Sequence, residues 1–330
     1  MHITVLSGGI GGARFLTGLL AALDSGPGGR AEHQVTVVAN TADDITLHGL
    51  RVCPDLDTVM YTLGGGANPD QGWGRADETF AVADELAAYG AGFDWFTLGD
   101  KDFATHIMRS RMLALGYPLS QVTTALSRRW GLGPGTGVDL LPMTDSGVET
   151  HVVIEDADGR RAIHFQEWWV GRHAKPAAEQ IVLTGVEQAV PAPGVVEAIR
   201  AADLVILPPS NPVVSLGPIL AVPGVRDAVR GTRAPVVGYS PIVGGQPVRG
   251  MADACLRAIG VETSARAVGG LYADLLDLWL VDTADADLDG TGVPGGRAPV
   301  RAIPLMMRDV PATAAMAQAG LALAGNGRSR

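Results

Sequence analysis

Apolar runs and glycine-rich breaks alternate along the first forty residues of the chain. Residues 2–7 are apolar and partly β-branched, a pattern typical of a buried parallel strand. Residues 13–23 carry apolar side chains at helical spacing, and residues 35–39 form a second apolar run. The glycine turn between the first two segments completes the pattern of a βαβ unit.

The alternation continues along the chain, with a helical stretch in the middle. We predict that residues 60–130 form a largely helical insertion around one strand at 93–98, and that the helix over 77–89 buries Phe80, Ala83 and Leu86 or Ala87. An Asp-Gly turn at 158–159 predicts a β-hairpin. The other predicted elements are helices near 56–63, 102–115, 119–130 and 312–324, hairpin strands over 150–155 and 160–170, and strands over 203–207, 235–239 and 278–281.

This rhythm predicts a doubly wound, mostly parallel, Rossmann-like α/β sheet with a helical insertion and a β-hairpin, in a single domain over residues 1–330. Ligands of such sheets bind outside the carboxyl ends of the strands. The loops that follow strands are therefore where we expect the functional residues.

Composition and charge exclude several classes of function. The chain has 25 basic and 35 acidic residues, a net charge of −10, which disfavours binding to nucleic acid or to an anionic membrane. Its two cysteines, Cys53 and Cys255, exclude a disulfide scaffold and a CxxC metal site. The sequence has no signal-peptide pattern and no apolar segment of membrane-spanning length, so a cytoplasmic location is expected.

The glycine turn that follows the first strand, Gly8-Gly9-Ile10-Gly11-Gly12, opens a helix and is a candidate phosphate site. It differs from the dinucleotide-binding fingerprint, because Arg14 stands where a small residue is needed and Asn40, not an acid, ends the second strand. The glycines also suit a plain tight turn, but the cation of Arg14 favours phosphate contact.

Four aspartates follow the second strand within fifteen residues: Asp43, Asp44, Asp55 and Asp57. Carboxylates that are brought together repel one another unless a cation lies between them. The alternative is that Asp55 caps the helix that it precedes and the others face solvent. We expect the cap for Asp55, and a magnesium site at Asp43 and Asp57.

Three more loops add polar residues. Lys101 lies between two acids, and His106 and Arg109 share a helix face, although a lone histidine is more often structural. The proline-rich loop 208–212 and the turn at Ser240 each follow a buried strand. Loops after successive strands predict one long cleft. Trp168 or Trp169 could flank a planar ligand there, although core packing is the simpler interpretation.

Taken in order, these motifs resemble the 2-phospho-L-lactate transferase (CofD/FbiA) family of coenzyme F-420 biosynthesis. The matching segments are Gly8-Gly9-Ile10-Gly11-Gly12-Ala13-Arg14, Asn40-Thr41-Ala42-Asp43-Asp44, His48-Gly49, Cys53-Pro54-Asp55-Leu56-Asp57-Thr58-Val59, Leu98-Gly99-Asp100 with Ala104-Thr105-His106, Phe165-Gln166, Ser210-Asn211-Pro212 and Ser240-Pro241-Ile242. Three further segments are most similar to the actinobacterial, phosphoenolpyruvate-using branch: Gly64-Gly65-Gly66, Trp73-Gly74 and Gln166-Glu167-Trp168-Trp169-Val170.

The resemblance implies a cytoplasmic, homodimeric, magnesium-dependent transferase. It would move a phosphoenolpyruvyl or 2-phospho-L-lactyl group from a guanosine-diphosphate-activated donor to the ribityl hydroxyl of the deazaflavin Fo, releasing GMP and forming (dehydro) coenzyme F-420-0. Phosphoglycerate also fits as the transferred acid. The insertion 60–130 would line the Fo site.

The resemblance also assigns roles to residues. It implies catalysis and Mg²⁺ binding by Asp43 and Asp57, with Asp57 the candidate acceptor of the hydroxyl proton. The implied Fo contacts are Asp57, Thr97 and His106, and the implied nucleotide and phosphate contacts are Gly9, Gly11, Gly12, Arg14, Ser210, Asn211 and Ser240. A nicotinamide-dependent oxidoreductase and a non-catalytic guanine-nucleotide sensor are the alternatives.

Overall fold

A seven-stranded sheet forms the centre of the computed structural model, which describes residues 1–26, 28–92 and 95–326. Its strand order is β14-β13-β10-β9-β1-β2-β5, and each pairing is parallel. The strands are β1 (His2–Ser7), β2 (Gln34–Ala39), β5 (Val138–Pro142), β9 (Leu204–Leu207), β10 (Val236–Tyr239), β13 (Leu278–Val281) and β14 (Val300–Ala302). The chain leaves β1 toward β5 and later continues from β9 toward β14, so the predicted doubly wound sheet is confirmed.

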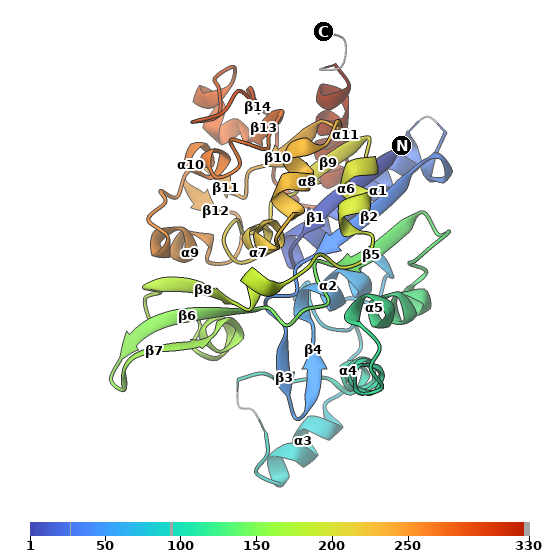
Figure 1. Cartoon of the computed structure of the whole chain (residues 1–330), viewed down its shortest axis with the longest axis vertical. Coiled ribbons are helices and arrows are strands. Elements are labelled where there is room, and N and C mark those ends of the chain that lie inside the picture. The colour runs from blue at the N-terminus through green and yellow to red at the C-terminus, as the bar shows by residue number, and fades with distance from the viewer. Residues whose placement is uncertain (27, 93–94, 327–330) are drawn as a thin grey trace.

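Helices cover both faces of the sheet (Figure 1). One face packs against α1 (Ile10–Ser25), α2 (Pro54–Leu63), α5 (Leu119–Ser127) and α11 (Val310–Asn326). The other packs against α6 (Val195–Ala201), α7 (Leu216–Ala221), α8 (Val225–Gly231), α9 (Ala252–Ala258) and α10 (Ala265–Gly270). Successive side chains of a strand point to opposite faces, which is why the inner strands β9, β10 and β13, covered on both sides, are buried at every position.

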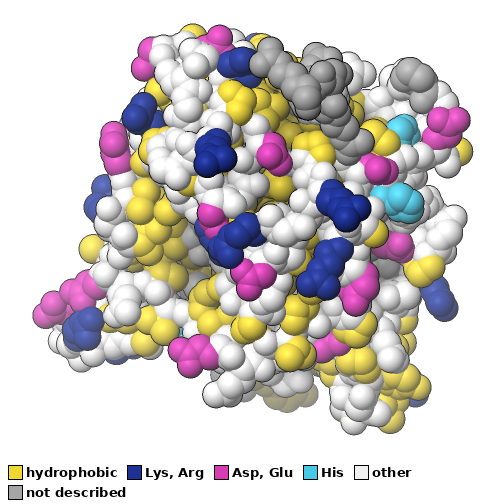
Figure 2. Space-filling model, turned by 45° about the horizontal axis from the view of Figure 1, so that its top comes forward, with side chains coloured by type: hydrophobic (Ala, Val, Ile, Leu, Met, Phe, Trp, Pro, Cys, Tyr) yellow, Lys and Arg dark blue, Asp and Glu magenta, His cyan; other side chains and the backbone are white. Residues whose placement is uncertain are grey.

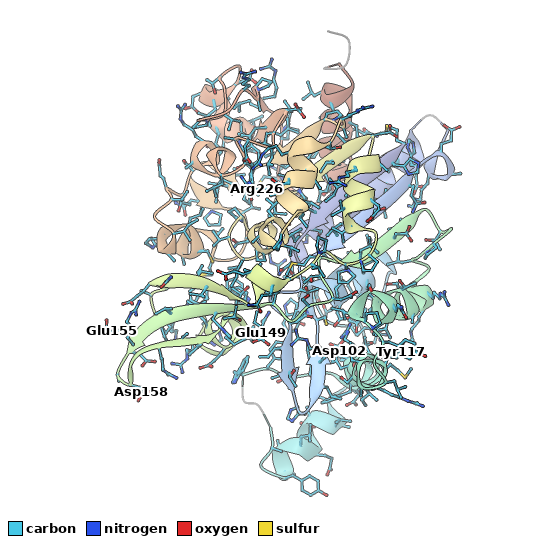
Figure 3. The ribbon with its side chains drawn as sticks, viewed as in Figure 1. Asp102, Tyr117, Glu149, Glu155, Asp158 and Arg226 are labelled. Atoms are coloured by element: carbon cyan, nitrogen blue, oxygen red, sulfur yellow. The ribbon has the colours of Figure 1, made fainter. Side chains whose placement is uncertain are left out.

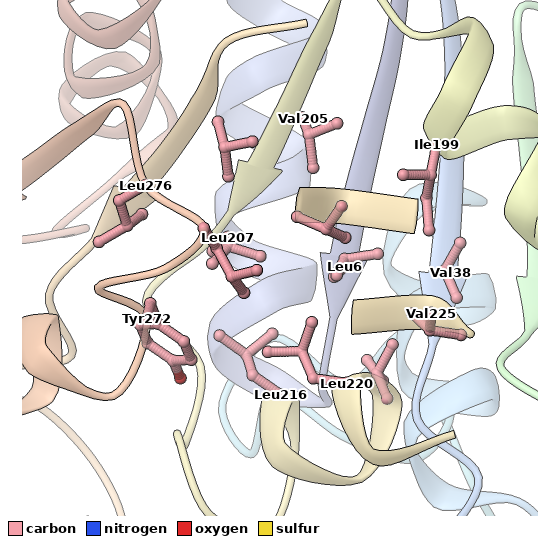
Figure 4. Close-up of a cluster of buried hydrophobic side chains, with 14 of the residues drawn as sticks. Leu6, Val38, Ile199, Val205, Leu207, Leu216, Leu220, Val225, Tyr272 and Leu276 are labelled. Carbon is pink, nitrogen blue, oxygen red and sulfur yellow. The ribbon is translucent and has the colours of Figure 1, made fainter. Parts of the chain in front are cut away.

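Figure 4 shows the second of these two cores, in which strand residues meet the short helices. Leu6 of β1 and Leu207 of β9 lie near Leu216 and Leu220 of α7. All four side chains are buried. This packing fixes the ends of β1 and β9, and therefore the two loops that begin there.

Smaller antiparallel units extend from the central sheet (Figure 1). The predicted hairpin is confirmed, and its strands turn at Asp156 and Gly159. A third strand pairs with it, so the unit is a three-stranded sheet, and residues 167–171 form a π-helical turn instead of extending the hairpin. The strands of these units are β6 (Glu149–Asp156), β7 (Gly159–His164), β8 (Gln180–Thr184), β3 (Ile45–Leu47), β4 (Leu50–Val52), β11 (Ile242–Val243) and β12 (Gln246–Pro247).

The middle of the chain is helical as predicted, but two details are wrong. Residues 95–98 form no strand, and positions 93–94 lie outside the described residues. The helix α3 (Ala81–Ala88) buries none of its residues, and Phe80 is 46% exposed. Two kinds of contact hold α3. The Asp100 carboxylate at the start of α4 (Asp100–Ala114) accepts from the N–H groups of Ala81 and Val82, and the half-buried Leu86 packs against a small core that includes Phe103.

Candidate functional site

The predicted cleft is a cavity of about 950 Å³ at the carboxyl edge of the sheet. Loops that follow β1, β2, β9, β10 and β14 contribute to its wall. Among the sequence-predicted residues, those that line it are Gly9, Gly11, Arg14, Asp43, Asp57, Thr97, His106, Ser210 and Asn211. Two others do not: Gly12 is packed between Ser7 and Ser210, and the Ser240 hydroxyl bonds to the backbone of Ile242.

The glycine turn is shaped by close packing. A Cβ at Gly9 would lie 2.4 Å from Oδ1 of Asp55, and one at Gly11 would lie 2.7 Å from the carbonyl oxygen of Pro209. The helix α1 has no side-chain cap and no acid in its first turn. Its first N–H groups are therefore free to meet an anion in the cavity. Burial lowers the pKa of Arg249, and the positive charge of the nearby Arg14 lowers it further.

This packing predicts that Gly11→Ala destabilises the protein by about 1–3 kcal/mol, because the added methyl group meets backbone that cannot move aside. The matched control is Gly231→Ala at the end of α8, where no atom lies within 4 Å of the added Cβ. We expect the control to be neutral or to gain up to ~1 kcal/mol. Urea denaturation measures both values, and equal stabilities would contradict the prediction.

Asp43 and Asp55 form an acidic pair in the cavity wall, and Asp55 faces the glycine turn. Burial, and then the charge of Asp55, raise the pKa of Asp43 well above its usual value. Burial likewise raises the pKa of Asp55 to about 6, although its Oδ2 accepts a hydrogen bond of 3.0 Å from Asn40. The expected cap is wrong: Cys53 precedes α2 without a side-chain cap, and Asp55 is turned toward Asn40 instead.

This pair fits a divalent cation. Oδ1 of Asp43 is buried without a hydrogen-bond partner, which is costly for a carboxylate unless a cation meets it. Within residues 1–26, 28–92 and 95–326, no three His, Cys, Asp or Glu side chains are grouped to hold a metal alone. Magnesium suits such a pair, because it binds one or two carboxylates and takes its other ligands from water and phosphate.

Asp57 lies in a different arrangement. Arg109 of α4 is almost fully buried and donates from Nη1 to Oδ2 of Asp57 at 3.0 Å and from Nη2 to Oδ1. The same Nη1 lies 3.1 Å from Nδ1 of His106, so the predicted helix face of His106 and Arg109 is confirmed. Both oxygens of Asp57 are thus engaged by a fixed cation.

The contact with Arg109 also sets the tautomer of His106. A guanidinium only donates, so Nδ1 accepts and the proton lies on Nε2. Burial lowers the pKa of His106 to about 4, which keeps the ring neutral at physiological pH. Nε2 is buried without a partner in a side chain that lines the cavity. His106 therefore offers one N–H donor to a ligand oxygen.

Aromatic side chains cover the remaining wall. Trp73, Trp95 and Phe96 line the cavity together with Tyr61 and Trp169. Trp169 stacks on the ring of Phe165 with centroids 6.1 Å apart and planes at 16°. Trp168 is fully buried and donates to the carbonyl of Pro176, so it is a core residue. The wall suits a flat ligand.

Buried carboxylates predict how stability depends on pH without a divalent cation. Burial raises the pKa values of Asp44 and Asp102 to about 7 and that of Asp43 well above its usual value. When the pKa of an acid is higher in the folded protein than in the unfolded chain, stability is lost as the pH rises through the folded-state pKa, because the buried group must then ionise. The lowered pKa values of His106 and His164 act oppositely, but only up to the unfolded value of 6.5. In EDTA, the melting temperature should therefore fall between pH 6.5 and 8, on the order of 5 °C; a rise would contradict this.

Comparison with known proteins identifies the family. The doubly wound sheet and its cleft at the switch point between β1 and β9 define a Rossmann-like α/β protein. The model of the family 2-phospho-L-lactate transferase CofD matches residues 3–292. The chain belongs to this family of transferases, which excludes the oxidoreductase alternative.

Relatives and solved structures agree with this assignment. The chain is 63% identical to a phosphoenolpyruvate transferase of Thermobifida fusca, with 98% of each chain covered. It is 56% identical to one of Mycolicibacterium smegmatis, covering 98% of this chain and 99% of the relative. A crystal structure of a Bacillus halodurans protein has a TM-score of 0.60 at 18% identity, covering 97% of this chain and 99% of that one, and supports the fold.

Two further observations concern the helices and the surface of the molecule. Among the described residues, no helix has both the length and the apolar character that a membrane span requires. On the face that Figure 2 shows, basic and acidic side chains are interspersed among apolar ones.

Proposed function

We propose that this protein transfers a phosphoenolpyruvyl, or 2-phospho-L-lactyl, group from a guanosine-diphosphate-activated donor to the ribityl hydroxyl of the deazaflavin Fo. GMP leaves, and the product is (dehydro) coenzyme F-420-0. Relatives that are 52–63% identical over nearly the whole chain are named phosphoenolpyruvate transferase, which favours that group. The observation that carries the proposal is one cavity in which an acidic pair faces a glycine turn and an aromatic wall lies beside them.

The donor diphosphate is assigned to the glycine-turn side. The uncapped N-terminus of α1 supplies N–H groups of Gly11 and its neighbours, and Arg14 and Arg249 supply positive charge. Ser210 and Asn211 lie in the loop after β9, and the Ser210 hydroxyl joins this loop to the glycine turn by accepting from the N–H of Gly8 at 3.4 Å. The Asn211 side-chain oxygen accepts from the N–H groups of Val213 and Val214, so Asn211 acts by shaping this loop.

Mg²⁺ is assigned to Asp43 and Asp55 rather than to Asp43 and Asp57. The pair Asp43 and Asp55 carries mutual repulsion and a bare oxygen, whereas Arg109 already neutralises Asp57. When bound, Mg²⁺ would neutralise charge that develops on the diphosphate oxygens.

Fo is assigned to the aromatic side. Trp73, Phe96 and Trp169 would flank the ring system, and the N–H of His106 at Nε2 would donate to a ring carbonyl. Thr97 lies in the same wall. Arg109 holds Asp57 at this side, where its carboxylate would accept from a ribityl hydroxyl group.

Product mass spectrometry tests the proposal. Purified protein with Mg²⁺, Fo and a guanylylated phosphoenolpyruvate, phospholactate or phosphoglycerate in turn should release GMP and form the phosphodiester with one donor preferred. A folded sample that binds GDP by calorimetry but forms no product with any donor would overturn the proposal in favour of a nucleotide sensor.

A further inference from the structure

Asp102 lies in the first turn of α4 and lines the main cavity, but it has no role in the binding of Mg²⁺, the donor or Fo as assigned above. Figure 3 shows it where α4 lies beside the β3–β4 hairpin. Its Oδ1 is buried and has no hydrogen-bond partner. An acid in the first turn can favour a helix through the helix dipole, but Asp102 does not cap α4, because Gly99 precedes the helix without any side-chain cap. The free oxygen of Asp102 is therefore available to a ligand.

The groups around Asp102 leave its charge largely uncompensated. Burial, then the negative charge of Asp57, and further that of Glu78 raise its pKa to about 7. The hydroxyl group of the Tyr61 side chain, and to a smaller extent the positive charge of Arg75, lower this pKa. The guanidinium of Arg75, however, lies over the rings of Tyr61 and Trp130, 5.2 and 4.7 Å from their centroids. Asp102 thus has a pKa near the pH at which a general base works best.

The other carboxylates of the cavity wall have competing partners. Four described acids line the cavity: Asp43, Asp55, Asp57 and Asp102. Asp43 and Asp55, of which Asp55 faces the glycine turn, are assigned to Mg²⁺, and Arg109 holds both oxygens of Asp57. Asp102 combines an unpartnered oxygen with a place on the aromatic side, where the acceptor is assigned.

We infer that Asp102 is the general base that accepts the proton of the attacking hydroxyl group. This inference rests on the proposed function. The hydroxyl O–H bond breaks and its proton passes to Oδ1 of Asp102, while the oxygen forms a bond to the phosphorus nearest the three-carbon acid. The bond from that phosphorus to the bridging oxygen breaks, and its electron pair leaves with GMP. Asp102 then returns the proton to solvent. Asp57, expected from the sequence to be the base, keeps its ion pair throughout.

The variant Asp102→Asn tests this role, because the amide keeps the shape but cannot accept the proton. With Fo and the preferred guanylylated donor, kcat should fall about 10²- to 10⁴-fold, while KM for Fo changes less than about threefold. The wild-type kcat should rise with pH up to about 7, and that rise should be absent in Asp102→Asn. The matched control is Asp84→Asn on the exposed surface of α3, with kcat and pH profile unchanged.

Any other result rejects either the role of Asp102 as the general base or the proposed function. Wild-type kcat in Asp102→Asn, or a KM increase with an unchanged pH profile, rejects the base. So does a wild-type profile that is flat between pH 5.5 and 8, a measurement that needs no variant to fold. Absence of product from wild-type protein with every donor rejects the proposed function and the base together, so the two failures can be told apart.

Discussion

Replacing Arg109 with methionine is expected to lower the free energy of unfolding by about 3–5 kcal/mol. The guanidinium is almost fully buried and is held by Asp57, by the carbonyl of Arg51 and by His106. Methionine fills part of the volume but leaves the buried carboxylate of Asp57 without its cation. Urea denaturation at pH 7.5 measures the loss.

Two further variants isolate the charge effect. The double variant Arg109→Met with Asp57→Asn should recover a large part of the loss, because it leaves no buried charge without a partner. The matched control is Arg257→Met, whose side chain is 74% exposed and pairs with Asp253 one helical turn away. We expect the control to change stability by less than about 1 kcal/mol. A loss below ~1 kcal/mol for Arg109→Met would show that solvent reaches Asp57.

The two edge strands, β5 and β14, were not predicted, because each is only partly buried and carries a charged residue, Asp139 or Arg301. The five inner strands were predictable because they are largely buried on both faces. Residues such as Val5, Leu6 and Ile206 therefore stand in continuous apolar runs. The position of the cleft followed from the same pattern, since loops after parallel strands meet at one edge. Short or polar strands gave no such signal: β3 and β4 have three residues each, and Arg51 stands in the middle of β4.

One apolar run was misassigned because it lines the cavity. Residues 95–98, Trp95-Phe96-Thr97-Leu98, are as apolar as a buried strand but form the aromatic wall. Sequence alone does not separate apolar side chains that face a ligand from those that face a core. Thr97 was therefore predicted to line the site, as it does, but the segment around it was wrongly predicted to be a strand.

The aspartates show why the site could be predicted only in part. Asp55 and Asp57 are two residues apart in α2, and side chains at that spacing point to different sides of a helix. Asp55 therefore faces Gly9 while Asp57 faces Arg109. The density of acids indicated a cation, but the choice between them depends on Arg109, which lies on a helix fifty residues away in the sequence. Asp102 was not singled out, because an acid in the first turn of a helix is favoured there by the helix dipole alone.

Asp43→Asn should abolish most of the turnover and the response of the protein to Mg²⁺. A bound divalent cation supplies several kcal/mol of transition-state stabilisation, and about 4 kcal/mol corresponds to roughly a 10³-fold loss of kcat. The metal-free variant should be at least as stable as the wild type, because one of two mutually repelling buried carboxylates becomes neutral. Thermal melts with and without Mg²⁺ separate these effects, and Asp287→Asn on the surface is the control.

The neighbouring aspartates decide between the two ligand sets. If Asp43 and Asp55 hold the ion, Asp55→Asn loses the Mg²⁺-induced rise in melting temperature, whereas Asp57→Asn keeps that rise and still loses turnover through the acceptor side. The opposite pattern would identify Asp43 and Asp57 as the Mg²⁺ ligands. Arg109 would then have to release the carboxylate of Asp57 when the metal binds. Because Arg109 is buried and bonded to both oxygens of Asp57, that release would cost several kcal/mol, so we expect the first pattern.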